Sequence, residues 1–336
     1  MKNYSIFKNN FRVLRKTSYF NILIILIFLI IISSIFSKYF LDYYNIQSLL
    51  RDLAFIGLIT LAQCLLLILG DIDLSLGKIS ALSGVIAGIL MVQMKVNPFL
   101  SLILCLVFGS FLGLINGLLV SKLKLNSLVV TVGMSGVYGG FNLVFTQGRA
   151  ITNIPKNIYF LGQGYIFKLP TPFIFMIIFT ILIILMAEFT RPGRYIYAVG
   201  NNSEAAKILG INVDNIRIFV FTLAGFLSSI AGVLMVARLG TSQPGIGESW
   251  PLNSIAGCVI GGVSLTGGVG EPIGAILGIS VIIIIQNMIV LFGVSPYWQT
   301  AVSGIIVVIA IAIGALSNIM SEKQEKSSQL KTTLIE

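Results

Sequence analysis

Histidine is absent from this chain, and charged residues are scarce. Lys, Arg, Asp and Glu together make up 10% of the 336 residues, whereas a soluble domain carries about 25%. Hydrophobic residues make up 56% of the chain, and its mean hydropathy is +0.98. This composition excludes a soluble globular domain and predicts an all-α polytopic membrane protein.

The missing histidine also removes several kinds of active site. Cys64, Cys105 and Cys258 each lie alone within an apolar run, so no Cys pair or Cys–His set is available to bind a metal. A serine hydrolase would lack its usual base, and we therefore interpret the Gly-Met-Ser-Gly run at 133–136 as a helix-packing motif. We expect no catalytic residue, no metal and no cofactor.

A nucleotide-binding loop is missing as well. The nearest match to the pattern G-x-x-x-x-G-K-[ST] is at Gly77 and Lys78. There Ile79 stands where Ser or Thr belongs, and Ile72 stands in place of the first glycine. Any ATP hydrolysis is therefore expected in a partner protein. The net charge of +10 is spread over loops without an aromatic-interleaved basic patch, so we expect no nucleic-acid partner.

Ten apolar segments approach the length of about 20 residues that a bilayer demands. The segments 75–94 and 253–268 are rich in glycine and polar residues, so each is a candidate for a broken or half-spanning helix buried by its neighbours. The ten segments are 20–36, 53–70, 75–94, 98–120, 127–146, 170–189, 218–237, 253–268, 273–292 and 298–318.

The distribution of basic residues predicts the orientation. Residues 1–19 carry five Lys or Arg and no acidic residue, and the first apolar run follows without a small-residue cleavage site. Alternating the spans from there places 15 Lys or Arg on the cytoplasmic side and 7 outside, as the positive-inside rule requires. Both termini are then cytoplasmic, and so is the polar segment 190–217 between the sixth and seventh spans.

This polar segment carries the signals of one short helix. The Asn-Ser pair at 202–203 can accept the unpaired amide hydrogens of a helix start, and Gly210 can end the helix. Ala205, Ile208 and Leu209 share one face. Because an isolated helix below about 12 residues is marginal in water, this one needs a surface to pack on. That surface is either a partner protein or the chain's own membrane domain. The predicted docking residues are Ser203, Glu204, Ala205, Ala206, Lys207, Ile208, Leu209 and Gly210.

Polar side chains in or next to the spans are candidates for lining a path for a solute. Neutral amides suit a substrate with many hydroxyl groups. Small residues recur on one face of several spans, however, and close helix packing explains the same positions. Asp73 has a second interpretation as a cap for the third span. The candidate path residues are Asp73, Asn116, Thr131, Asn142, Gln286 and Asn287.

Charged residues avoid the centres of the predicted spans. A proton- or sodium-coupled carrier more often keeps a carboxylate at mid-membrane, because buried charges there tend to mark function. This argues against an ion-coupled secondary carrier for a small polar solute, which stays as the alternative function. The charges at or near span ends are Asp71, Asp73, Lys78, Glu188, Arg238 and Glu271.

Several motifs occur in a fixed order between residues 50 and 315. They are Gly70 with Ile72-Asp73-Leu74-Ser75-Leu76-Gly77, then Asn116-Gly117-Leu118-Leu119-Val120, then 193–202 leading through Glu204-Ala205-Ala206 to Gly210-Ile211, then Gly261-Gly262, Ser264-Leu265 and Gly267-Gly268, and last Gly293-Val294-Ser295 before Trp298-Gln299. Together they resemble the permease subunit of the ribose-type monosaccharide ABC importers, a bacterial family related to the galactose, xylose and autoinducer-2 permeases.

The resemblance implies a transmembrane permease domain at 20–318, between cytoplasmic segments 1–19 and 319–336, in the bacterial inner membrane. Its partners would be a second permease copy or a paralogue, a cytoplasmic ABC ATPase subunit or tandem ATPase, an extracytoplasmic sugar-binding protein and membrane lipid. Residues 203–210 become the coupling helix that seats in a groove of the ATPase. The implied function is import of a ribose-like sugar. Departures from the family are Asp71 for a frequent glycine, Asn126-Ser127 for prolines, and Pro251-Leu252-Asn253 for an acidic pair.

Overall fold

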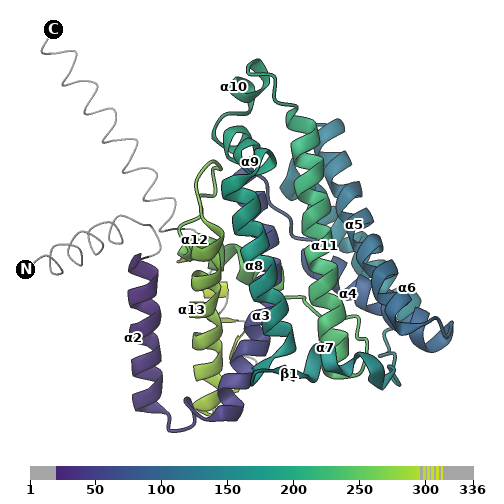
Figure 1. The fold of residues 1–336 in the computed structure, drawn as a ribbon, viewed down its shortest axis with the longest axis vertical. Helices are drawn as coiled ribbons and strands as arrows, with labels where there is room; N and C mark the ends of the chain where they lie inside the picture. Colours follow the sequence, from purple (N-terminus) through teal and green to yellow (C-terminus); the bar gives the residue numbers. More distant parts are fainter. Residues whose placement is uncertain are drawn as a thin grey trace, which may run out of the picture.

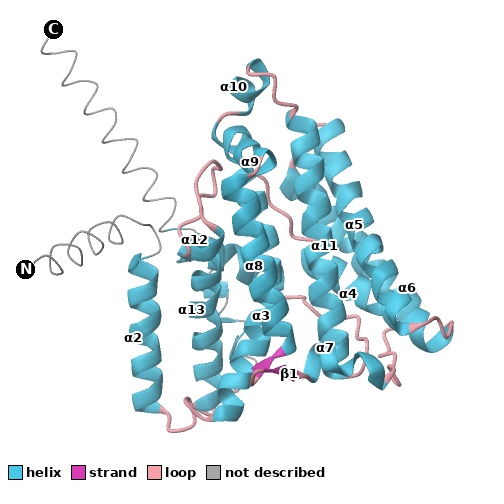
Figure 2. Ribbon diagram, viewed as in Figure 1, coloured by secondary structure: helices cyan, strands magenta, loops and turns pink. Residues whose placement is uncertain are grey.

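The computed structural model describes residues 20–295 and, beyond them, residues 298–299, 301–302, 304–305, 308–309 and 312. The predicted cytoplasmic segments 1–19 and 319–336 lie outside the described residues, as does most of the predicted tenth span. The described chain forms a bundle of helices joined by loops and by one short hairpin (Figures 1 and 2).

The helices of the described part are α2 Phe20–Phe36, α3 Tyr43–Leu69, α4 Leu76–Gly88 with the π-helical turn η1 Ile89–Gln93, α5 Pro98–Lys122, α6 Ser127–Thr146, the 3₁₀ turn η2 Lys156–Ile158, α7 Tyr159–Gln163, α8 Thr171–Phe189, α9 Arg191–Asn201, α10 Ser203–Ile208, α11 Val213–Leu239, α12 Trp250–Ile260 and α13 Pro272–Leu291. Strands β1 Tyr165–Ile166 and β2 Leu169–Pro170 pair antiparallel between α7 and α8.

Seven helices of the described part are long and apolar enough to cross a membrane, namely α3, α4 with η1, α5, α6, α8, α11 and α13. The helices α2 and α12 are apolar but shorter. The prediction of a helical polytopic membrane protein is confirmed. The total of ten spans stays a prediction, because the tenth lies largely outside the described residues.

The central helix of the bundle is α3. All of its residues from Ala54 to Leu69 are buried, because α8, α11, α12 and α13 pack around it. A helix that is apolar on every side is stable only in such surroundings or in lipid. It begins at Tyr43, well before the predicted start at 53, because the Asp42 carboxylate caps it by accepting the N–H of Tyr44 at 3.1 Å.

The backbones of α5 and α11 lie in close contact. A Cβ added at Gly113 would lie 2.2 Å from the carbonyl oxygen of Phe221, and one at Gly225 would lie 2.2 Å from the carbonyl oxygen of Gly109. Only glycine allows this approach, which brings the two helix backbones together over several turns. The glycines of α5 therefore pack against α11.

Two helices begin near the middle of the bundle instead of at one of its ends. Trp250 opens α12, and its ring stacks on Phe55 at a centroid distance of 6.4 Å. Phe55 lies near the centre of α3. The start of α4 is beside it, since a Cβ at Gly77 would lie 2.0 Å from the carbonyl oxygen of Gly247. The loop 70–75 reaches this level from the end of the bundle that carries α10, and the loop 240–249 from the far end (Figure 1).

The predicted eighth span, 253–268, is therefore only half of a span. Its helix is α12, in which Pro251 occupies the first turn, where no backbone N–H is needed, and which ends at Gly261. Asn253 and Ser254 are buried against protein, which explains polar residues at this depth. The short helix α12 favours the half-spanning interpretation of this segment. The segment predicted at 75–94, in contrast, is helical from Leu76 to Gln93.

Candidate functional site

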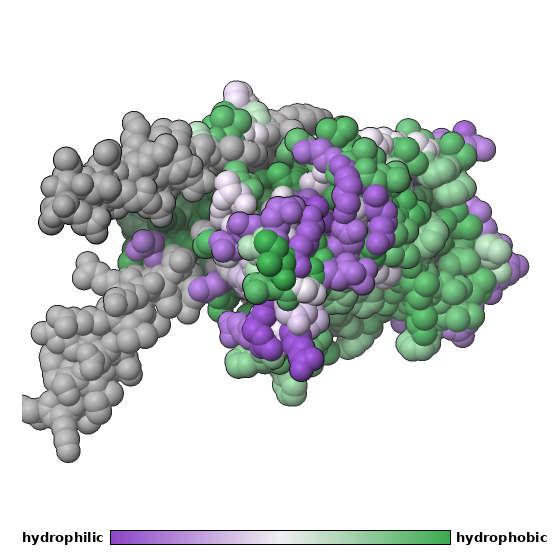
Figure 3. Space-filling model, turned by 90° about the horizontal axis from the view of Figure 1, so that it is seen from above, coloured by the Kyte–Doolittle hydropathy of each residue, from purple (hydrophilic) through white to green (hydrophobic). Residues whose placement is uncertain are grey.

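A short arm formed by α9 and α10 (residues 191–208) projects from one end of the bundle (Figure 1). Seen from that end, hydrophilic residues gather over the centre of the molecule, with hydrophobic surface on the flanking helices (Figure 3). The arm corresponds to the polar segment of the sequence. We call this end of the bundle the α10 end and the opposite one the far end.

The tip of the arm, α10, has the caps that the sequence predicted. The side-chain oxygen of Asn202 accepts the N–H of Ala205 at 2.9 Å, and Gly210 follows the helix with φ +82°. Ala206 is buried against the arm, whereas Ile208 and Leu209 are 87% and 79% exposed. Two large apolar side chains thus stand uncovered at the extremity of the molecule. The docking role of residues 203–210 stays a prediction that this geometry favours.

The base of the arm, α9, was not predicted from the sequence. Thr190 starts it by accepting the N–H of Gly193 at 3.3 Å, and Pro192 lies in its first turn. Ile196 and Val199 are buried on one face against the bundle. The sequence does contain signals for this helix: the Thr190 cap, Pro192 and the apolar spacing of its buried face. Because α9 is short and starts two residues after α8 ends, its start could not be told from the end of α8.

The arm is clamped to the bundle through backbone contacts. A Cβ at Gly193 would lie 2.2 Å from the carbonyl oxygen of Met186 in α8, and one at Gly200 would lie 1.8 Å from that of Ile68 in α3. The hydroxyl of Tyr197 donates to the carbonyl oxygen of Gly270 at 2.8 Å. The arm therefore contacts α8, the end of α3 and the loop before α13 at once.

An ion pair next to the arm joins the loop after α3 to the start of α11. Arg217 Nε lies 3.1 Å from Asp71 Oδ2, although the two atoms are not aligned for a hydrogen bond. Burial raises the pKa of the Asp71 carboxyl, and the charge of Arg217 and a hydrogen bond from Ser127 oppose this effect. The residue that departs from the family glycine is therefore buried and paired with a cation.

Three of the predicted path residues meet in a buried network that holds the start of α4. Asp73 Oδ1 accepts from the Ser75 hydroxyl at 2.6 Å, and Asn116 Nδ2 donates to Asp73 Oδ2 at 3.1 Å. The hydroxyl of Tyr138 lies 3.0 Å from Asn116 Oδ1, and Thr131 Oγ1 accepts the N–H of Leu74 at 3.2 Å. Asp73, Asn116 and Thr131 are fully buried. They connect the start of α4 to α5 and α6.

Asn142, another predicted path residue, is buried on α6. Neither the oxygen nor the nitrogen of its side-chain amide has a hydrogen-bond partner among the described residues. An unpaired buried amide costs about 1–3 kcal/mol, so the position carries a polar group that packing alone does not require.

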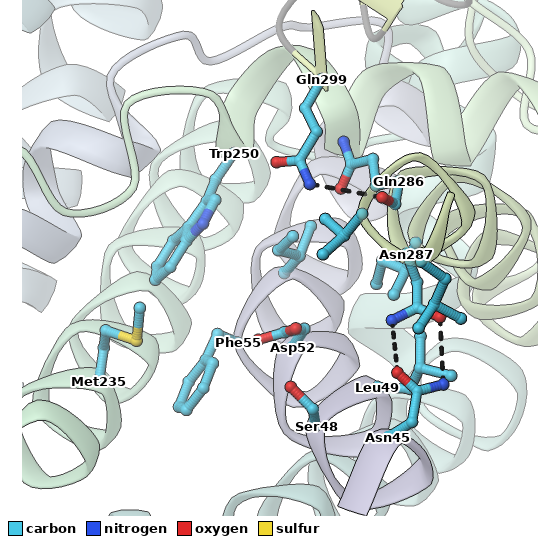
Figure 4. Close-up of a pocket in the computed structure, with 14 residues that line it drawn as sticks. Asn45, Ser48, Leu49, Asp52, Phe55, Met235, Trp250, Gln286, Asn287 and Gln299 are labelled. Atoms are coloured by element: carbon cyan, nitrogen blue, oxygen red, sulfur yellow. Dashed lines mark hydrogen bonds between the residues drawn. The ribbon is translucent and has the colours of Figure 1, made fainter. Parts of the chain in front are cut away.

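Gln286 and Asn287, the last two predicted path residues, line a cavity of about 360 Å³ in the far half of the bundle (Figure 4). Asn287 and Asn45 exchange two amide hydrogen bonds, of 2.8 and 3.2 Å. Gln299 donates to the backbone oxygen of Gln286 at 3.3 Å. The cavity is lined by Asn45, Ser48, Leu49, Asp52, Phe55, Ile56, Met235, Trp250, Ile283, Gln286, Asn287, Val290, Leu291 and Gln299.

The cavity combines two kinds of wall. Phe55 and Trp250 form an aromatic side, and Asn45, Ser48 and Asp52 bring polar groups from the first turns of α3. Flat rings with nearby amides and a carboxylate suit a small solute that has apolar faces and many hydroxyl groups. Sequence reasoning missed Trp250 and Phe55, because an aromatic residue inside an apolar run gives no sign of whether it faces lipid, protein or a cavity.

Comparison with known proteins defines the class. Residues 45–311 match the family described as the branched-chain amino acid transport system / permease component. This match covers well over half of the chain, which therefore belongs to this family of membrane permeases.

Particular relatives are sugar permeases. The ribose import permease protein RbsC of Bacillus subtilis is 40% identical over 291 residues, which cover 86% of this chain and 90% of the relative. The galactose/methyl galactoside import permease protein MglC of Haemophilus influenzae is 31% identical over 91% of this chain and 96% of the relative. The fructose import permease protein FrcC of Rhizobium meliloti is 32% identical over 87% of this chain and 83% of the relative. No solved structure matched the chain. The resemblance to ribose-type permeases is confirmed.

Proposed function

We propose that this chain is the permease subunit of an ABC importer that carries a monosaccharide, with a ribose-like sugar foremost, across the bacterial inner membrane. The named relatives import ribose, galactose or fructose, and the ribose permease is the most similar of the three described above. The single observation that carries the coupling part of the proposal is the exposed apolar tip of α10 on an arm clamped to the bundle.

The α10 end faces the cytoplasm in this proposal. Among all Lys and Arg of the sequence, 15 were assigned to the cytoplasmic side, and the structure moves Lys78 to mid-height. The remaining 14 still outnumber the 7 on the other side. The cavity then lies in the outer half of the membrane, where a sugar released by an extracytoplasmic binding protein would enter.

Force from the ATPase passes through the arm to the bundle. Ile208 and Leu209 seat in the ATPase, and movement of α10 displaces α9, whose contacts lie at the ends of α3 and α8 and on the loop 261–271. Because α3 and α12 hold Phe55 and Trp250 together, a shift of α3 changes the shape of the cavity. The arm therefore transmits motion and performs no chemistry, and ATP hydrolysis belongs to the partner.

Other partners follow from the same proposal. The outer faces of α2, α5 and α8 expose large apolar side chains that suit membrane lipid. A second permease copy, identical or paralogous, completes the membrane part. An ion-coupled carrier acting alone is the rival function, and it predicts uptake by the purified chain in liposomes under an ion gradient without ATP or partners.

Replacing both apolar tip residues tests the proposal. Burying Ile208 and Leu209 in a partner contributes about 1.5–3 kcal/mol each, so Ile208→Glu with Leu209→Glu should weaken ATPase binding by at least about 100-fold. Phe167→Glu at the exposed hairpin of the far end is the matched control and should bind normally. Co-purification with the co-expressed importer ATPase and ribose uptake are measured together. Unchanged co-purification and uptake in the double variant would refute docking through α10.

A further inference from the structure

An ion pair stands on an exposed surface at the middle of the bundle. Lys78 Nζ lies 3.1 Å from Glu248 Oε1, and the two side chains are 23% and 75% exposed. The sequence placed Lys78 at the end of a span, on the cytoplasmic side. The structure instead places it in the first turn of α4, beside the loop that leads into α12.

The depth of this pair follows from its neighbours. Gly77 and Gly247, each adjacent in sequence to one member of the pair, touch through their backbones. Trp250 stacks on Phe55, which lies 12 residues from the first residue of α3 and 14 from the last. At 1.5 Å per residue these are roughly 18 and 21 Å, so the pair lies near the centre of a hydrocarbon layer about 30 Å thick.

Lipid is an unfavourable medium for the Glu248 side chain. A charged side chain at the bilayer centre costs about 2.5–3.5 kcal/mol on insertion scales, and more in simulations. The backbone around it is irregular as well, since Gln243, Gly245 and Ser249 are exposed in the same non-helical loop. Irregular backbone at membrane depth is tolerated only where protein buries it or where it lines a water-filled cavity.

We infer that the Lys78–Glu248 pair lines the water-filled passage and contacts the sugar at mid-membrane. This inference rests on the proposed function and adds to it a second contact point, below the outer cavity and beside the starts of α4 and α12. A carboxylate accepts hydrogen bonds from sugar hydroxyls and an ammonium donates to them, so the pair can exchange its mutual contact for contacts with a neutral polyol. The Lys78 side chain also passes beside Gly139 of α6.

Cysteine accessibility tests this inference in the whole importer held in lipid nanodiscs. The native chain is a suitable background, because Cys64, Cys105 and Cys258 are fully buried. Glu248→Cys should react with a charged, membrane-impermeant methanethiosulfonate reagent, and saturating ribose should slow this reaction at least fivefold. The matched control is Ile181→Cys, an exposed apolar position near the middle of α8 that faces lipid in this proposal and should not react.

Three outcomes would overturn the inference. In the first, Glu248→Cys reacts with the reagent no faster than Ile181→Cys does. In the second, Glu248→Cys reacts but ribose does not slow the reaction. In the third, Glu248→Cys does not react because it forms a disulfide with its counterpart in a second permease copy. If Glu248→Cys does not assemble, Ser249→Cys occupies the neighbouring exposed position with a near-isosteric change and carries the same three outcomes. The reactivity of Glu248→Cys without sugar does not depend on ATPase docking. This measurement can therefore fail while the docking of α10 holds, and the two proposals are tested separately.

Discussion

Adding one methyl group at Gly200 should loosen the arm from the bundle while leaving the tip of α10 unchanged. A Cβ at this position would lie 1.8 Å from the carbonyl oxygen of Ile68 and 2.7 Å from the amide nitrogen of Gly268. An ordinary contact needs about 3.4 Å, so α9 must move away from α3 by roughly 1.6 Å. Both neighbours are backbone atoms, which cannot turn aside as a side chain can.

Two contributions set the energy of this displacement. Overpacking of this kind costs about 1–3 kcal/mol. The methyl group also presses against both partners of the hydrogen bond from the Gly268 N–H to the Ile68 carbonyl oxygen, whose N···O distance is 2.8 Å, and disrupting that bond costs about 1 kcal/mol more. A total of about 2–4 kcal/mol corresponds to a roughly 30- to 800-fold shift toward the detached arm.

The assay is sugar transported per ATP hydrolysed, in proteoliposomes that contain the permease, its ATPase and its binding protein. Gly200→Ala should bind the ATPase normally, because Ile208 and Leu209 are untouched, and should transport less sugar per ATP hydrolysed than the native protein, because more of its molecules carry a detached arm. Gly133→Ala adds the same methyl group to a position with no atom within 4 Å and should behave like the native protein. Native coupling in Gly200→Ala would refute the idea that force passes through α9.

Replacing Asn116 with alanine leaves buried partners unpaired, so the melting temperature of the solubilised protein should fall by the equivalent of about 1–3 kcal/mol, and an unchanged melting temperature would contradict the buried network. Trp250→Ala removes the aromatic wall and should raise KM for uptake about tenfold, whereas Trp250→Phe keeps a ring and should stay within about threefold; equal values for the two variants would count against stacking. Arg217→Ala strands the buried carboxyl of Asp71 and should destabilise the protein more than Asp71→Asn combined with Arg217→Met, as thermal melting would show; the reverse order would refute the pairing.

The helical membrane class was predictable because it depends on composition and on the length of apolar runs. The caps of α10 were predictable because Asn202 and Gly210 act within a few residues of their own positions in the chain. The half-length of α12 was anticipated from its glycines and polar residues. In each case the physical cause lies within one short stretch of sequence.

Features that depend on contacts between residues far apart in the chain could not be predicted from the sequence. Lys78 was assigned to a span end, because nothing in its own neighbourhood shows that the loop 70–75 carries the chain down to mid-height before α4 begins. Asp73, Asn116 and Thr131 were grouped with Gln286 by polarity alone. The structure separates them, since the first three are tied together in the buried network while Gln286 lines the cavity.

The central position of α3 has a consequence for how the protein is assembled. From Ala54 onward this helix is surrounded by protein, although its sequence is apolar enough to partition into lipid by itself. Once such a helix is inserted, packing into the bundle exchanges its lipid neighbours for helices, and that exchange gains nothing from expelling water. Close packing has to drive it, so substitutions in this half of α3 should spare membrane insertion and leave the permease trapped as a loose set of inserted helices.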